Sequence, residues 1–113
     1  MPKEYSRISR VESLIQAEIA QLIELDFRYL DLGLVTVTNV KVSPDLSRAK
    51  IYFIVHEKEK KQEILKHLQQ EAKSLRHLLC QRVKLRKSPE LHFYYDDVVE
   101  HGDRISKLLN TSS

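Results

Sequence analysis

The spacing of the apolar residues is the feature that most constrains the fold of this 113-residue chain. Apolar side chains first recur every three or four residues, then alternate with polar ones over two short stretches. They then return to the first spacing, and finally alternate again. The first spacing places side chains on one face of a helix, and alternation places them on one face of a strand. The pattern therefore predicts the order helix, strand, strand, helix, strand.

The first helix is expected to begin at Ser9, because Ser9 and Glu12 have the spacing of a capping box. In that motif each side chain bonds the exposed backbone N–H of the other residue. The apolar stripe of this helix extends to about Leu25 and contains Val11, Leu14, Ile15, Ile19, Leu22 and Ile23.

Residues 34–43 are predicted to form a bulged strand, because Val35 and Val37 alternate with threonines and the phase then slips at Asn39. Residues 43–45, Ser-Pro-Asp, favour a turn, since proline presets φ for the second position of a type I turn. A second strand follows and should pair with the first as a hairpin. Its residues expected on one face are Ala49, Ile51, Phe53 and Val55, with Lys50, Tyr52 and Ile54 on the other.

A long helix is predicted from about Lys60 to Gln81 or Arg82, after which Ser88-Pro89 breaks the helical pattern. A third strand follows, in which Leu91, Phe93 and Tyr95 alternate with His92 and Tyr94. Asp97 and Glu100 have capping-box spacing for a short last helix that carries Ile105, Leu108 and Leu109.

The length and the single cysteine limit the class of protein. A chain of this size is expected to form one domain over residues 1–113, with about 5–109 ordered. Cys80 is the only cysteine, so no intramolecular disulfide can form, and a reducing compartment fits. No stretch approaches the length of a membrane span. We therefore expect a cytoplasmic monomer with no membrane partner.

The predicted order is that of a type II KH-like α+β domain, and several fragments resemble one family. The fragments are residues 42–51, 75–76, 85–86 and 89–93, followed by Gly102, Arg104, Ile105, Leu108 and Leu109. Residues 42–51 read Val-Ser-Pro-Asp-Leu-Ser-Arg-Ala-Lys-Ile, and 89–93 read Pro-Glu-Leu-His-Phe. Together these fragments resemble the bacterial ribosome-binding factor A family.

The resemblance implies a single KH-like domain, α-β-β-α-kink-α-β, that lacks the usual glycine clamp loop. It also implies binding to free small (30S) ribosomal subunits through 16S rRNA. The implied role is late subunit assembly and maturation of the rRNA 5′ end, important at low temperature. The family's helix kink corresponds here to Ala72, Lys73 and Ser74, with serine in place of the usual glycine. A second departure is residues 29–33, Tyr-Leu-Asp-Leu-Gly, where many members have Asp-Pro-Arg-Leu-Gly.

Basic residues are concentrated in one part of the chain. Residues 57–72, here called the mixed segment, carry four lysines and four glutamates, whereas residues 73–87, the basic segment, carry six basic side chains and no acid. Such a cluster favours phosphate backbones, because binding releases condensed counterions. A solvated surface would normally intersperse acids. The residues expected to contact RNA are Arg7, Arg10, Lys73, Arg76, Arg82, Lys84, Arg86 and Lys87.

Two other functions compete with ribosome binding. One is a general single-strand RNA-binding chaperone of cold stress, and the other is a metal-dependent nuclease. The only acidic cluster for such an enzyme is Asp96, Asp97, Glu100 and Asp103, which lacks a partnered general base. We therefore expect no enzyme activity, metal, cofactor or small-molecule substrate.

The aromatic residues on the second faces of the strands also allow two interpretations. Tyr52, Tyr94 and His92 are residue types that stack on unpaired bases. Packing beneath helices, or a plain surface position, is the preferred prediction for all three.

Overall fold

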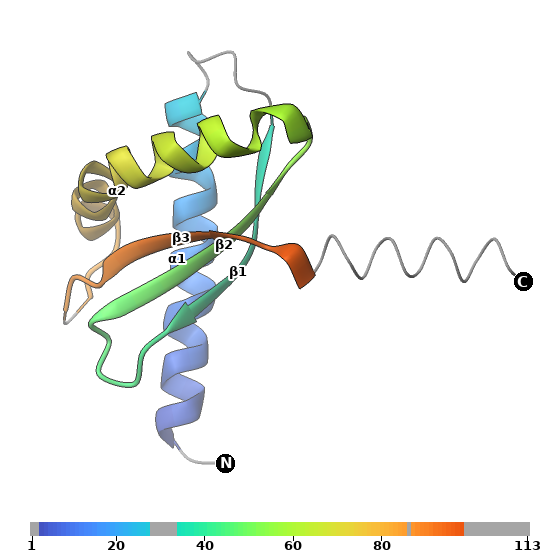
Figure 1. The fold of residues 1–113 in the computed structure, drawn as a ribbon. Coiled ribbons are helices and arrows are strands. Elements are labelled where there is room, and N and C mark those ends of the chain that lie inside the picture. Colours follow the sequence, from blue (N-terminus) through green and yellow to red (C-terminus); the bar gives the residue numbers. More distant parts are fainter. Residues whose placement is uncertain (1–2, 28–33, 86, 99–113) are drawn as a thin grey trace, which may run out of the picture.

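The computed structural model of the protein describes residues 3–27, 34–85 and 87–98. Its elements are α1 (Lys3–Phe27), β1 (Val35–Val42), β2 (Arg48–Val55), a short 3-10 helix η1 (Lys58–Lys60), α2 (Lys61–Arg82) and β3 (Glu90–Tyr95). The predicted order helix, strand, strand, helix, strand is confirmed (Figure 1).

The three strands form one sheet in the order β1-β2-β3. β1 pairs antiparallel with β2, and the register shifts between Val37 and Asn39, where the bulge was predicted. The turn between these strands is closed by the backbone N–H of Leu46, which donates to the Ser43 carbonyl over 2.8 Å. β3 pairs with β2 in parallel, so that Arg48 lies opposite Glu90. The two strands therefore begin at the same end of the sheet.

Both helices pack on one face of the sheet, α1 mainly over β1 and α2 mainly over β3 (Figure 1). Alternation along β2 buries Ala49, Ile51, Phe53 and Val55, as predicted. The buried side chains of both helices and all three strands form one core cluster. Leu14 does not belong to it, because 45% of its surface is exposed. One face of the sheet is thus covered by helices, and the other carries the remaining strand residues.

The predicted start of the first helix at Ser9 is wrong, because α1 begins at Lys3. Glu12 does not act as part of a capping box. Its Oε2 accepts the backbone N–H of Val42 over 2.8 Å, at the end of β1. A contact between distant segments thus uses the carboxylate that local spacing assigned to the helix end.

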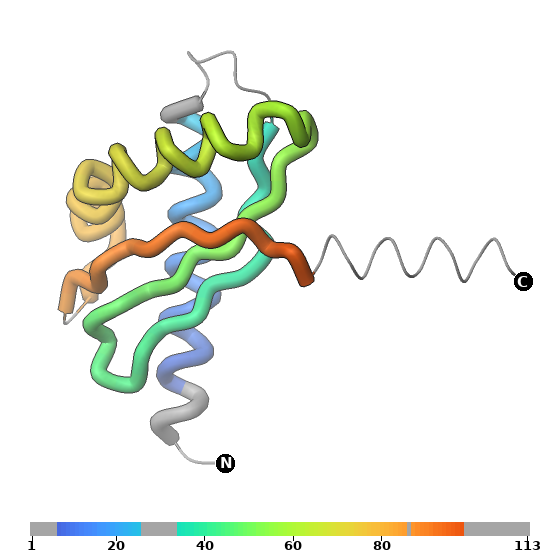
Figure 2. Tube along the Cα trace, viewed as in Figure 1, coloured from blue at the N-terminus to red at the C-terminus, as the bar shows by residue number. Residues whose placement is uncertain are grey.

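α2 is one helix from Lys61 to Arg82, and Ala72, Lys73 and Ser74 lie within it. Its path nevertheless changes direction, because the first part crosses the view and the last part is seen almost along its axis (Figures 1 and 2). A continuous helix can bend sharply where a small residue or an inserted side chain disturbs its hydrogen bonds. Assignment of the bend to Ala72-Lys73-Ser74 stays a prediction.

Two predictions concern residues outside the described part of the chain. The last helix, with Glu100, Ile105, Leu108 and Leu109, lies beyond residue 98, and residues 29–33 lie in the gap before β1. In the described ranges, neither long helix carries an apolar stretch suited to crossing a membrane.

Candidate RNA-binding surface

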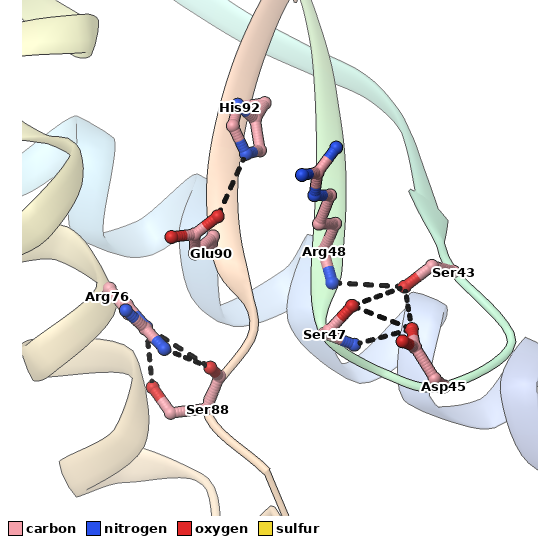
Figure 3. A network of polar contacts seen from close by, with 8 residues as sticks. All are labelled: Ser43, Asp45, Ser47, Arg48, Arg76, Ser88, Glu90 and His92. Carbon is pink, nitrogen blue, oxygen red and sulfur yellow. Dashed lines mark hydrogen bonds and ion pairs between the residues drawn. The ribbon is translucent and has the colours of Figure 1, made fainter.

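The β1–β2 turn, the start of β3 and the second half of α2 meet at one end of the sheet (Figure 3). The backbone N–H of Glu90 donates to the Ser47 carbonyl over 2.9 Å, which joins β3 to the turn. Arg76 of α2 reaches the chain just before β3, and its Nε donates to Ser88 Oγ over 2.9 Å. Nη2 of the same guanidinium donates to the Ser88 carbonyl. Three segments that are distant in sequence are therefore held together by backbone and guanidinium hydrogen bonds.

A shallow depression lies between these three segments, and we call it the serine depression. It is lined by Ser47, Arg48, Arg76, Lys87, Ser88 and Glu90. The lining thus consists of three cationic side chains, one carboxylate and two serine hydroxyls. Arginine and lysine supply charge-assisted hydrogen bonds to phosphate, and serine hydroxyls add neutral donors. The chemistry of the depression suits a phosphate group.

A second hollow of about 160 Å³ lies between α1, the turn and the segment after α2, and we call it the α1 hollow. Its apolar lining consists of Val11, Val42, Leu46, Leu85 and Pro89, and its cationic residues are Arg7, Lys84 and Lys87. Lys87 lines both hollows. The two hollows therefore form one continuous basic surface, to which α1, β2, α2 and the segment before β3 all contribute.

The turn beside this surface is held by a carboxylate. Asp45 Oδ1 accepts the Ser47 hydroxyl over 2.7 Å, the Ser43 hydroxyl over 2.7 Å and the Ser47 backbone N–H over 3.1 Å. These hydrogen bonds, that of the Ser47 hydroxyl most of all, lower the pKa of Asp45 from 3.8 to about 2. Leu46 in the same turn has φ of 61°, a region that non-glycine residues rarely occupy. The network stabilises this conformation and leaves Asp45 engaged within the turn.

The structure brings four of the predicted RNA contacts together. Arg7, Arg76, Lys84 and Lys87 line the two hollows. Arg10 and Lys73 are exposed on α1 and α2 but line neither. Arg86 lies outside the described residues.

Arg82 is directed elsewhere in the described structure. Its Nη1 lies 3.4 Å from Glu18 Oε2 and 3.2 Å from Gln21 Oε1, both on α1. A guanidinium engaged in this way holds the two helices together. Contact of Arg82 with RNA remains a prediction.

Arg48 was missed as a site residue, although it belongs to a fragment that carries the family resemblance. It opens β2 and lies opposite Glu90 at the start of β3. Alternation alone places it on the face opposite Ala49. The parallel pairing that brings it beside Ser88 and Arg76 has no local signal in the sequence.

The acidic residues after β3 take part in structural contacts. Thr38 donates its hydroxyl to Asp96, which is buried, and Asp97 lies 3.7 Å from the Lys61 ammonium. Glu100 and Asp103 lie outside the described residues. Within the described ranges, no three histidine, cysteine or carboxylate side chains are grouped as metal ligands would be.

The fold and the surface together define a class of protein: a small α+β domain of the KH-like type, with a basic surface at one end of its sheet. Residues 7–109 match the family model described as "Ribosome-binding factor A". The chain belongs to the ribosome-binding factor A family.

Relatives and solved structures agree with this assignment. The chain is 43% identical to ribosome-binding factor A of Azoarcus sp. (strain BH72), over 97% of this chain and 88% of the relative. It is 44% identical to that of Nitrosococcus oceani, over 97% of this chain and 87% of the relative. The crystal structure of ribosome-binding factor A from Thermus thermophilus superposes with a TM-score of 0.69 and 26% identity, over 78% of this chain and 94% of that one.

A further similar structure comes from a complex. A homology model of the Thermus thermophilus factor, fitted into a cryo-EM map of a 30S–RbfA complex, has a TM-score of 0.65 and 27% identity. The match covers 75% of this chain and 90% of that one.

Proposed function

We propose that this chain binds free small ribosomal subunits through 16S rRNA, with the two basic hollows in contact with rRNA phosphates. The observation that carries the proposal is the convergence of cations from four segments on one continuous surface. Arg7, Arg48 and Arg76 come from three different elements, and Lys84 and Lys87 follow α2. Family membership and the 30S complex of a similar protein support the same partner.

The proposed mechanism is binding without catalysis. A factor that binds one arrangement of the rRNA more tightly than another shifts the population toward that arrangement. In this way the chain assists late assembly of the subunit and maturation of the 5′ end of 16S rRNA. Low temperature slows the escape of RNA from wrong arrangements, so the assistance matters most in the cold. Because ribosome assembly is a cytoplasmic process in bacteria, we propose that the protein acts in the cytoplasm, and that it does so as a monomer.

A general single-strand RNA chaperone is the alternative, because phosphate contacts alone carry no sequence information. The two functions differ in their competitors. A ribosome-binding factor should keep its affinity for 30S subunits in the presence of excess unrelated RNA, whereas a general binder should be displaced.

Sedimentation of the tagged protein in cell extract tests the proposal. We expect the protein in the fractions of free small subunits and little of it in polysomes. A tenfold mass excess of unstructured RNA should leave that distribution unchanged. Equal occupancy of all ribosomal fractions, or loss from the 30S peak on addition of the competitor, would contradict the proposal.

A further inference from the structure

The second face of the sheet is open in the described part of the chain, because both helices pack on the other face. We call this surface the open face. Its central residues follow from the strand register: Lys41 lies opposite Lys50 and Lys50 opposite His92, and in the next row Tyr52 lies opposite Tyr94. Tyr94 is 43% exposed although it belongs to a strand. Tyr94 thus occupies the surface position, whereas Tyr52 and His92 are partly buried on the same face.

The two tyrosines form an aromatic pair. Their ring centroids are 5.7 Å apart and the ring planes are inclined by 30°. Offset or tilted aromatic pairs at this separation are favourable contacts. Among the described strands β3 is an edge strand, so Tyr94 lies on the outermost strand of that sheet. The pair forms an aromatic platform on the open face, which also carries Ile54 of β2.

Cations lie beside this platform, toward the start of β2. Lys50 Nζ lies 6.0 Å from the centroid of the Tyr94 ring, and Lys41 is the exposed neighbour of Lys50 on β1. Arg48 lies two residues before Lys50 on β2 and also lines the serine depression. Figure 3 shows Arg48 beside His92 and Glu90, on neighbouring strands. The open face is therefore continuous with the basic surface described above.

We infer that the open face binds unpaired nucleotides, with bases stacked on Tyr94 and Tyr52 and the adjoining phosphates held by Lys50 and Lys41. This inference rests on the proposed RNA-binding function and extends it to a second, chemically different surface. Flat aromatic rings flanked by cations match the two parts of a nucleotide, the base and the phosphate. A second copy of the chain is a poorer occupant, because it would bring Lys41 and Lys50 against like charges.

The experiment compares single-ring variants of the full chain. Tyr94→Leu removes the ring and keeps an apolar side chain, whereas Tyr94→Phe keeps the ring and removes only the hydroxyl. The probe is a fluorescein-labelled ten-nucleotide oligoadenylate, and its affinity is measured by anisotropy at several salt concentrations. Equal melting temperatures show that the variants are folded.

We expect Tyr94→Leu to weaken oligoadenylate binding by about fivefold or more, which is the size of one lost base stack. Tyr94→Phe should stay within about twofold of the parent chain. The salt slope should not change, because neither variant loses a charge. Oligouridylate should bind more weakly than oligoadenylate, since the smaller base stacks less.

Three outcomes overturn the inference. The first is equal affinity of the parent and Tyr94→Leu chains, and the second is no binding of the oligonucleotide by the parent chain. The third is a parent dimer in sedimentation equilibrium that Tyr94→Leu dissociates, which would assign the face to self-association. In each case 30S binding by the parent chain would leave the proposed function intact, and its absence would remove both.

Discussion

The mixed segment and the basic segment differ in how the charges of their cations are neutralised. In the mixed segment, cations have acidic neighbours: Lys60 lies 3.1 Å from Glu57, and Lys61 lies 3.7 Å from Asp97. Lys61 also lies 3.9 Å from the centre of the Tyr95 ring. In the basic segment, Arg82 lies 3.4 Å from Glu18 of α1, but Arg76 bonds the neutral oxygens of Ser88, and Lys84 and Lys87 line open hollows.

The difference concerns which cations have a carboxylate partner. Charges that are paired locally serve the fold and are screened by their partners. Cations that form no ion pair within the described residues, such as Lys84 and Lys87, remain available for phosphate groups, although Asp45 and Glu90 lie near Lys87. The contrast favours the prediction that the basic segment binds RNA, and not the mixed segment, although the mixed segment has more lysines.

The largest expected effect comes from removing charges in one segment at a time. Lys84→Gln with Lys87→Gln should lower affinity for 30S subunits by about tenfold at physiological salt. The slope of log affinity against log salt should fall by about 0.7 to 0.9 for each lost contact. Binding titrations at four or more salt concentrations measure both quantities.

The matched control removes two lysines from the mixed segment. Lys58→Gln with Lys66→Gln changes the net charge equally, and neither residue lines the serine depression or the α1 hollow. Its affinity should stay within about twofold of the parent chain. Equal losses from both double variants would show that net charge, not position, determines binding.

Arg76 should matter to stability through its shape as well as its charge. Its guanidinium spans the carbonyl and the hydroxyl of Ser88, a two-point contact that a lysine ammonium does not reproduce. Arg76→Lys should therefore lower the free energy of unfolding by about 1 kcal/mol. The effect is no larger because solvent screens charged hydrogen bonds that are partly exposed. Urea unfolding measures the change.

Lys73 provides the control for this substitution. It is exposed on the same helix, and Lys73→Ala should change the free energy of unfolding by less than about 0.5 kcal/mol. If Arg76→Lys were as stable as the parent chain, the contact with Ser88 would not hold α2 to the start of β3.

Most of the fold follows from short-range patterns. The bulge at Asn39, the turn after Ser43 and the alternation of β3 depend on a few neighbouring residues, and spacing predicts all three. The predicted start of α1 was wrong, because spacing assigned Glu12 to a capping box. Glu12 instead accepts a hydrogen bond from the Val42 backbone N–H, and no local pattern indicates that contact.

The site was predictable only where its residues are neighbours in sequence. Lys84 and Lys87 were expected because they lie in the basic segment. The place of Arg48 depends on parallel pairing with β3, and the pairing of Arg82 with Glu18 depends on how α1 and α2 cross. Such long-range geometry is set by packing of the whole core.

The bend in α2 is predicted to lie at the boundary of the two segments, and substitution of Ser74 tests that position. Glycine in a straight exposed helix costs about 1 kcal/mol relative to alanine, whereas at a bend its wider conformational range offsets that cost. We expect Ser74→Gly and Ser74→Ala to differ by less than about 0.5 kcal/mol in the free energy of unfolding. Thermal and urea unfolding of both variants measure it, and a glycine variant weaker by the full amount would place the bend elsewhere.

The smallest expected effect concerns Asp45, the carboxylate in the turn beside the basic segment. Lys87 contributes least to its lowered pKa, and the Ser47 hydroxyl contributes most. Ser47→Ala should therefore raise the pKa of Asp45 from about 2 toward its ordinary value of 3.8. Because the folded pKa lies below the unfolded one, the stabilisation from this carboxylate is present above about pH 4 and is lost as the pH falls to about 2. The difference in the free energy of unfolding between the parent and Ser47→Ala chains should shrink over the same window.

An NMR titration of the Asp45 side-chain carbon follows the group directly, and Lys87→Gln is the control. If Lys87→Gln raised the pKa of Asp45 more than Ser47→Ala did, the nearby cation, and not the turn, would hold the carboxylate ionised, and the basic segment would be partly neutralised in the same way as the mixed segment.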